Sequence, residues 1–122
     1  MSFARLARAL APAVLLATLA PNAGAADDAT TRLYDHSLRR LHADESVRLA
    51  DRYAGQPVLV VNTASHCGFT RQFRELEAVH QRFKERGLKV AGFPSDDFRQ
   101  EAADEAETAE VCFQNFGVTF DM

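Results

Sequence analysis

The sequence predicts one α/β domain built around a pair of parallel central strands. Residues 58–61 are a continuous run of valine and leucine, the pattern of a strand buried on both faces, and residues 88–93 form a second apolar run that ends at Pro94. Each run is followed by a stretch with apolar residues at helical spacing. The order strand, helix, strand, helix favours a sheet in which the two strands lie side by side and parallel.

The first 25 residues have the pattern of a signal peptide. Arg5 and Arg8 precede an apolar stretch, residues 9–20, that is too short to span a bilayer, and residues 23–25 (AGA) form an A-x-A cleavage site. We therefore expect a signal peptide over residues 1–25, a mature domain over residues 26–122, and a periplasmic or secreted location. An alanine-rich N-terminal helix of the mature domain is the alternative.

The charge balance argues against two classes of partner. Cleavage after Ala25 would remove two of the 14 basic residues and leave 12 basic and 17 acidic side chains, a balance of −5 without a basic cluster. Such a domain is not expected to bind nucleic acid or an anionic membrane.

The elements around the first central strand follow from local patterns. Residues 33–43 contain isolated apolar residues among polar ones, a pattern that fits a small hairpin. Residues 55–57 (GQP) predict a turn. After the strand, Thr70 is the expected N-cap of the first helix and Gly87 its C-terminal stop. The apolar face of this helix is expected to comprise Phe69, Phe73, Leu76, Val79 or His80, and Phe83.

The second helix is expected to begin among acidic residues, which the helix dipole favours there. These acids are Glu101, Asp104, Glu105 and Glu107, and the expected apolar stripe is Ala109, Cys112, Phe113 and Phe116. Gly117 ends the helix, and residues 118–120 begin another extended segment. We therefore expect the chain to stop as a third central strand begins, with Met122 as a truncation point.

Cys67 is the residue whose position most clearly predicts chemistry. It follows the first strand and precedes the first helix, where unpaired N–H groups and the positive end of the helix dipole bias a thiol toward the reactive thiolate. Residues 95–100 follow the second strand. Because sites in open α/β sheets gather beyond the carboxyl ends of the strands, the two loops are expected to be neighbours. Gln100 offers an amide that can donate to a thiolate or a peroxide oxygen.

The other candidate residues each have a plainer interpretation. Gln100 also fits a solvated glutamine, and Cys112, on an apolar stripe, also fits a buried core cysteine. His66 is expected to be exposed, because neighbours at a strand end often point apart. A zinc site formed by Cys67, Cys112, His66 and His80 lacks any recognised ligand spacing. Two cysteines in an exported chain also fit a structural disulfide.

Three motifs resemble those of the glutathione peroxidase family. Residues 60–70 (VVNTASHCGFT) are similar to its cysteine signature, residues 92–98 (GFPSDDF) to its second signature, and residues 116–120 (FGVTF) to a third stretch. They occur in the family's order and spacing, and the resemblance runs from about Leu33 to Met122. Within the family, the chain resembles the non-selenium, cysteine-containing, thioredoxin-dependent type.

The resemblance implies a thioredoxin-like fold, here incomplete: βαβα plus the start of a third central strand. It also implies a thiol peroxidase that reduces hydrogen peroxide and organic hydroperoxides in the response to oxidative stress, without a metal or bound organic cofactor. Cys67 matches the peroxidatic cysteine, Cys112 the resolving cysteine, and Gln100 the family's glutamine if one residue is missing after Phe98. A thioredoxin-like protein or glutathione would then be the reductant.

The sequence also departs from the family pattern. It contains no tryptophan, so the Trp-Asn pair of the family's site is absent, which fits truncation and bears on the activity of a chain that ends at Met122. Ser95 stands where many members carry cysteine, and Asp121 where proline is usual. Two alternatives remain. One is a redox-inert or redox-sensing thioredoxin-fold binding domain with a lasting disulfide, and the other is a non-functional fragment.

Overall fold

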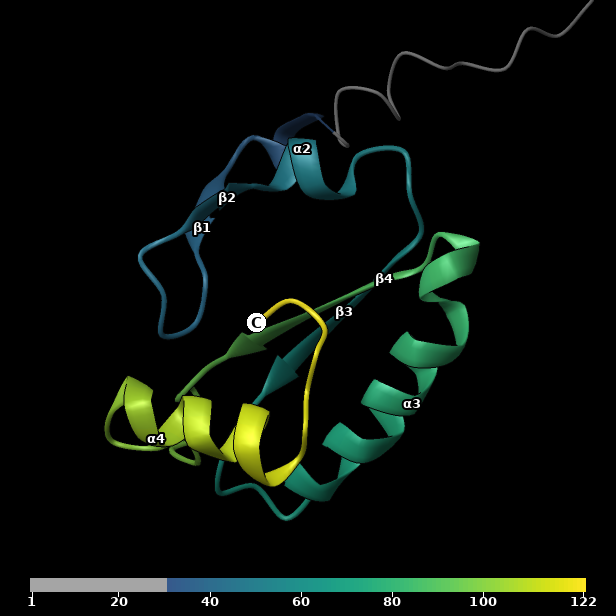
Figure 1. The fold of residues 1–122 in the computed structure, drawn as a ribbon. Helices are drawn as coiled ribbons and strands as arrows, with labels where there is room; N and C mark the ends of the chain where they lie inside the picture. The colour runs from purple at the N-terminus through teal and green to yellow at the C-terminus, as the bar shows by residue number, and fades with distance from the viewer. Residues whose placement is uncertain (1–30) are drawn as a thin grey trace, which may run out of the picture.

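The computed structural model describes residues 31–122, and the predicted signal peptide lies outside them (Figure 1). The described elements are the hairpin strands β1 (Ser37–Arg39) and β2 (Ser46–Arg48), α2 (Leu49–Tyr53), β3 (Val58–Thr63), η1 (Thr70–Gln72), α3 (Phe73–Phe83), η2 (Lys84–Arg86), β4 (Lys89–Pro94), α4 (Glu105–Ala109) and the π-helical η3 (Glu110–Asn115). From β3 onward the described elements follow the predicted order, whereas the hairpin lies at residues 37–48 and not 33–43, and α2 was not predicted.

The central sheet is the predicted parallel pair. β3 and β4 pair in register along their whole lengths. A third segment joins β4, because Asp121 forms a parallel bridge with Ala91 and its carbonyl oxygen accepts the Gly92 N–H at 2.8 Å. The predicted extended segment at residues 118–120 is not a strand in the structure, and the pairing beside β4 is this single bridge at Asp121. In Figure 1 the α4–η3 segment lies near the carboxyl ends of both strands.

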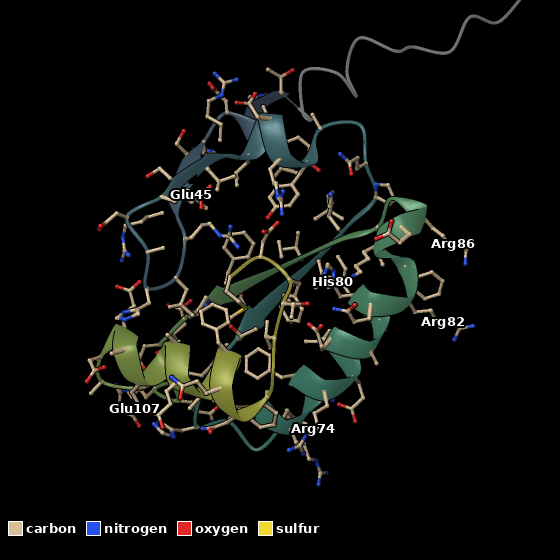
Figure 2. All side chains as sticks on the ribbon, viewed as in Figure 1. Glu45, Arg74, His80, Arg82, Arg86 and Glu107 are labelled. Carbon is tan, nitrogen blue, oxygen red and sulfur yellow. The ribbon has the colours of Figure 1, made fainter. Side chains whose placement is uncertain are left out.

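The core lies between β4, the two helical segments and the C-terminal stretch. Its buried members are Phe73, Val90, Cys112, Val118, Phe120 and Met122. His80 packs edge-on against Phe120, with ring centroids 6.1 Å apart. Figure 2 shows His80 turned inward while Arg74, Arg82 and Arg86, on the same helical segment, point outward. The helix therefore buries one apolar stripe, as its sequence predicts, and Gly87, with φ of 91°, ends the segment.

Two expectations about the first strand and helix are wrong. Leu59 and Val60 are 36% and 62% exposed, because β3 is the edge strand of the described sheet and pairs only with β4. Phe69 is 67% exposed, because it precedes η1 and does not lie on α3.

The expected cap and stripe positions also differ from the structure. Thr70 does not cap a helix, since it begins η1 and its hydroxyl donates to carbonyl oxygens. Phe113 is exposed although it belongs to the predicted stripe of the second helix. The reason is the π-helical turn, in which the Phe116 N–H bonds the Val111 carbonyl oxygen five residues back. Asp104 is the N-cap, and its carboxylate accepts the Glu107 N–H. Among residues 31–122, no helix has the length and apolarity needed to cross a bilayer.

Candidate active site around Cys67

Cys67 lies in the loop that joins the end of β3 to η1, as the sequence predicts. Thr70 holds this loop as a tight turn. Its hydroxyl donates to the carbonyl oxygens of Ala64 at 2.8 Å and Cys67 at 2.7 Å, and its N–H donates to the Cys67 carbonyl at 3.0 Å. The thiol therefore sits directly before the first helical turn, on a loop whose shape is set by local hydrogen bonds.

The surroundings of the Cys67 sulfur suit a small reactant. The Phe69 N–H donates to Sγ at 3.4 Å, so the sulfur has a backbone donor beside it. The side chain is half-buried and borders a cavity of about 70 Å³. A single water needs roughly 10–15 Å³ by this measure, so the cavity has room for a few water-sized molecules. Hydrogen peroxide, or the peroxide group of an organic hydroperoxide, would fit into this cavity.

The loop after β4 lies beside the Cys67 loop, which confirms that the two are neighbours. The His66 N–H donates to the Gln100 carbonyl oxygen at 2.8 Å, and the Ser95 N–H donates to the Thr63 carbonyl oxygen at 3.1 Å. Gln100 itself is exposed. The structure thus brings the backbone of Gln100 to the residue next to Cys67, while a role for its amide in binding peroxide stays a prediction.

His66 is exposed, as its position at the strand end predicts. Its Nε2 lies 3.2 Å from Oε1 of Glu107, an exposed residue of α4 that Figure 2 labels. The imidazole is thus paired with a carboxylate on the second helical segment. This pairing supports the interpretation of His66 as a surface residue over one in which it serves Cys67 as a base.

Cys112 is buried in the core, with 1% of its surface exposed. Burial, and secondly the nearby charge of Glu101, raise the pKa of its thiol to about 12. The group is therefore a protonated thiol at neutral pH. Both Cys67 and Cys112 are free, and the burial expected of a residue on the apolar stripe is confirmed. The match to a resolving cysteine stays a prediction.

Glu101 is a member of the site region that sequence reasoning missed. From the sequence it is expected only as one of several acids at a helix start. In the structure its Oε1 accepts hydrogen bonds from Ser65 and Thr108, which come from the Cys67 loop and from α4. The one feature of the sequence that could have indicated a role for Glu101 is its position directly after Gln100. The spacing of apolar residues does not distinguish Glu101 from the acids that follow it.

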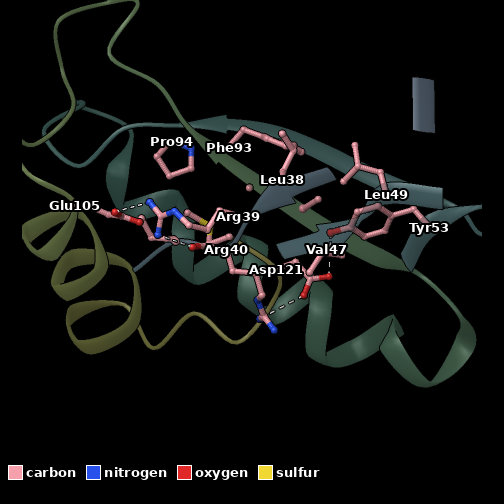
Figure 3. Close-up of a pocket in the computed structure, with 14 residues that line it drawn as sticks. Leu38, Arg39, Arg40, Val47, Leu49, Tyr53, Phe93, Pro94, Glu105 and Asp121 are labelled. Carbon is pink, nitrogen blue, oxygen red and sulfur yellow. Dashed lines mark hydrogen bonds and ion pairs between the residues drawn. The ribbon is translucent and has the colours of Figure 1, made fainter. Parts of the chain in front are cut away.

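Other cavities and clusters lie apart from the cysteines. No group of three or more histidine, cysteine or acidic side chains within residues 31–122 is placed to hold a metal ion. A larger cavity of about 350 Å³ lies between the hairpin and β4, and neither cysteine lines it (Figure 3). Ion pairs border it, including Arg39 with Glu105 at 2.7 Å. Because neither cysteine lines this cavity, it is not part of the candidate site around Cys67.

Fold and site together define a class of protein. Two parallel strands form the sheet, and Cys67 lies between the first strand and the helical segment that follows it. The loop that carries Gln100 lies against the Cys67 loop. The chain belongs to the glutathione peroxidase family, whose pattern matches residues 33–122, and it therefore has a thioredoxin-like fold.

Individual relatives agree with this assignment. The chain is similar to a glutathione peroxidase of Lactococcus lactis, with 46% identity over 90 residues that cover 73% of this chain and 56% of that protein. A glutathione peroxidase-like peroxiredoxin of Saccharomyces cerevisiae is 48% identical over 71 residues, 57% of this chain and 44% of its own. A glutathione peroxidase homologue of Bacillus subtilis is 44% identical over 71 residues, with the same coverage. The chain spans about half the length of the curated relatives it matches.

Proposed function

We propose that the protein is a thiol peroxidase in which Cys67 reduces hydrogen peroxide and organic hydroperoxides. The observation that carries the proposal is the Cys67 sulfur itself, which accepts a backbone N–H at 3.4 Å and borders a cavity sized for a small reactant. Membership of a family whose relatives are named peroxidases and peroxiredoxins supports the same reaction class.

The reaction begins at the Cys67 thiolate. Its sulfur attacks one peroxide oxygen, an S–O bond forms, and the O–O bond breaks to release water or an alcohol after the leaving oxygen takes a proton. Cys67 becomes a sulfenic acid, and the peroxide is reduced by two electrons. The Gln100 amide is proposed to hydrogen-bond the peroxide or the leaving oxygen.

Cys112 is proposed to resolve the sulfenic acid. Its sulfur would attack the Cys67 sulfur, form a disulfide and release water, after which a dithiol such as a thioredoxin-like protein reopens the bond. Because Cys112 is buried and its pKa is about 12, it must first leave the core. It lies in the π-helical η3, and π turns are a departure from regular helix that recurs at functional sites. Glutathione is the alternative reductant.

Peroxide-dependent oxidation of a reductant tests this function. We expect the full-length protein to oxidise a thioredoxin-like dithiol in the presence of hydrogen peroxide, and Cys67→Ser to abolish the activity. Cys112→Ser should keep the first peroxide turnover and lose recycling by the dithiol. Recycling by glutathione alone, undiminished in Cys112→Ser, would instead indicate a one-cysteine mechanism. Full activity in Cys67→Ser would show that Cys67 is not the nucleophile.

A redox-inert or sensing domain with a lasting disulfide is the second candidate. Both cysteines are free in the structure, and Cys112 is held in the core, which favours the peroxidase over this alternative. The two differ in one measurement, since a structural disulfide persists in the resting protein and a resolving pair forms only after peroxide.

We also propose that the protein is exported to the periplasm or secreted. The proposal rests on Arg5, Arg8, the apolar residues 9–20 and the cleavage pattern at residues 23–25. N-terminal sequencing of the mature protein should begin at Ala26. Mature material that begins at Met1 would overturn both the signal peptide and the location.

A further inference from the structure

One carboxylate connects the loop of Cys67 to the second helical segment. Oε1 of Glu101 accepts the Ser65 N–H at 3.1 Å and also the Ser65 hydroxyl. The same oxygen accepts the Thr108 hydroxyl, on α4, at 3.0 Å. Glu101 therefore bonds a residue two positions before Cys67 and a residue four positions before Cys112.

The backbone next to Glu101 strengthens the same contact. The carbonyl oxygen of Gln100 accepts the His66 N–H at 2.8 Å. Two consecutive N–H groups of the Cys67 loop thus donate to the second loop. The Ser65 N–H donates to the Glu101 carboxylate, and the His66 N–H donates to the Gln100 carbonyl oxygen. Without Glu101, the backbone bonds from His66 to Gln100 and from Ser95 to Thr63 would still join the two segments, but Ser65 would lose its partner in the second loop.

Glu101 is only partly buried, as is Glu105, but the groups that it bonds lie in a buried environment. Ser65 and Thr108, its partners, are 7% and 3% exposed, and its Oε2 is buried without a hydrogen-bond partner among residues 31–122. Glu107, by contrast, is an exposed acid of α4. Removing a carboxylate from water is unfavourable, and a residue that serves only the helix dipole needs no burial. The hydrogen bonds of Glu101 therefore do more than complement the dipole of the helix, because they join the Cys67 loop to α4.

We propose that Glu101 is a positioning residue for the Cys67 reaction, because its carboxylate holds the Cys67 loop, the Gln100 loop and the start of α4 in one geometry. This inference rests on the proposed function. Cys67 keeps its own turn through Thr70, so loss of Glu101 should not remove the thiol from its position before η1. The cavity that Cys67 borders is lined by residues between 61 and 76 and not by the second loop. What should be lost is therefore the fixed position of the second loop beside Cys67, on which the proposed contact of the Gln100 amide with peroxide depends.

Two reagents separate positioning from a general loss of structure. Hydrogen peroxide needs Cys67 and the second loop together, whereas iodoacetamide reports only the accessible thiolate. In Glu101→Ala we expect the peroxide rate constant of Cys67 to fall by roughly 10–100-fold, while the iodoacetamide rate changes by less than about threefold. Glu101→Gln keeps an acceptor oxygen for Ser65 and should retain more of the peroxide rate than the alanine variant. Glu110→Ala, which removes an exposed carboxylate of η3, is the matched control and should match the wild type.

Amide hydrogen exchange provides a readout that needs no peroxide chemistry. We expect faster exchange at Ser65 and His66 in Glu101→Ala, with less change in Glu101→Gln and none in Glu110→Ala. A wild-type peroxide rate in Glu101→Ala, equal falls of the peroxide and iodoacetamide rates, or unchanged exchange at both amides would each overturn the inference. If the wild type did not react with peroxide through Cys67, the proposed function would fail, and amide exchange would still decide whether Glu101 joins the loops.

Discussion

The thiol of Cys112 should react with alkylating reagents much more slowly in the folded protein than in the unfolded chain. Burial raises its pKa from 9.0 to about 12. At pH 7.5 the thiolate fraction then falls from roughly 3% to about 0.003%, a factor of ~10³. Because alkylation needs both the thiolate and access, and only 1% of Cys112 is exposed, native alkylation should be at least ~10³-fold slower than in the unfolded chain.

Alkylation followed by mass spectrometry measures this directly. The reduced protein is treated with iodoacetamide at pH 7.5, with and without denaturing urea, and the modified fraction of each cysteine is followed in time. Half-buried Cys67 is the internal control and should be modified far faster than Cys112 in the native protein. A native rate at Cys112 within about tenfold of the unfolded rate would refute the placement of this thiol in the core.

Two further predictions concern stability, measured by urea unfolding. Asp121→Asn should destabilise the protein by about 1–3 kcal/mol, because Arg52 and Tyr53 both donate to this carboxylate. Burial raises the pKa of Asp121, but these bonds outweigh it and lower the pKa overall, so the loss should shrink as pH falls below the ordinary value of 3.8. The exposed Asp51→Asn should change stability by less than about 0.5 kcal/mol, and an equal effect at both sites would contradict the assignment. Phe120→Ala should cost about 3–5 kcal/mol, since Phe120 is 2% exposed in the core, whereas Phe98→Ala, at a residue 76% exposed, should be nearly neutral. Similar losses at both phenylalanines would place the core elsewhere.

The parallel pair and the position of Cys67 follow from the sequence because each depends on local signals. The run at residues 58–61 marks a strand, Gly87 marks a helix end, and Cys67 lies between them in the chain. These signals act over a few residues, and β3, β4 and α3 form where they predict. The exposure of Val60 was missed because burial of a strand depends on its neighbours in the sheet.

The features that escaped prediction depend on contacts between distant segments. Phe113 leaves the buried stripe because of a π-helical turn, which has no clear local sequence signal. Glu101 has the sequence context of a solvated helix-start acid, and only the packing of α4 against the Cys67 loop turns its carboxylate toward Ser65. The position of Cys67 between strand and helix is thus visible in the sequence, whereas the contact of Glu101 with the Cys67 loop is visible only in the structure.

Trapping of the sulfenic acid tests the central claim, that Cys67 is the residue that reacts with peroxide. Cys112→Ser is treated with one equivalent of hydrogen peroxide in the presence of dimedone, and labelled peptides are quantified by mass spectrometry. We expect close to one dimedone per chain, located on Cys67, and none in the Cys67→Ser variant. Consumption of peroxide without a label on Cys67, or equal consumption in Cys67→Ser, would contradict the account.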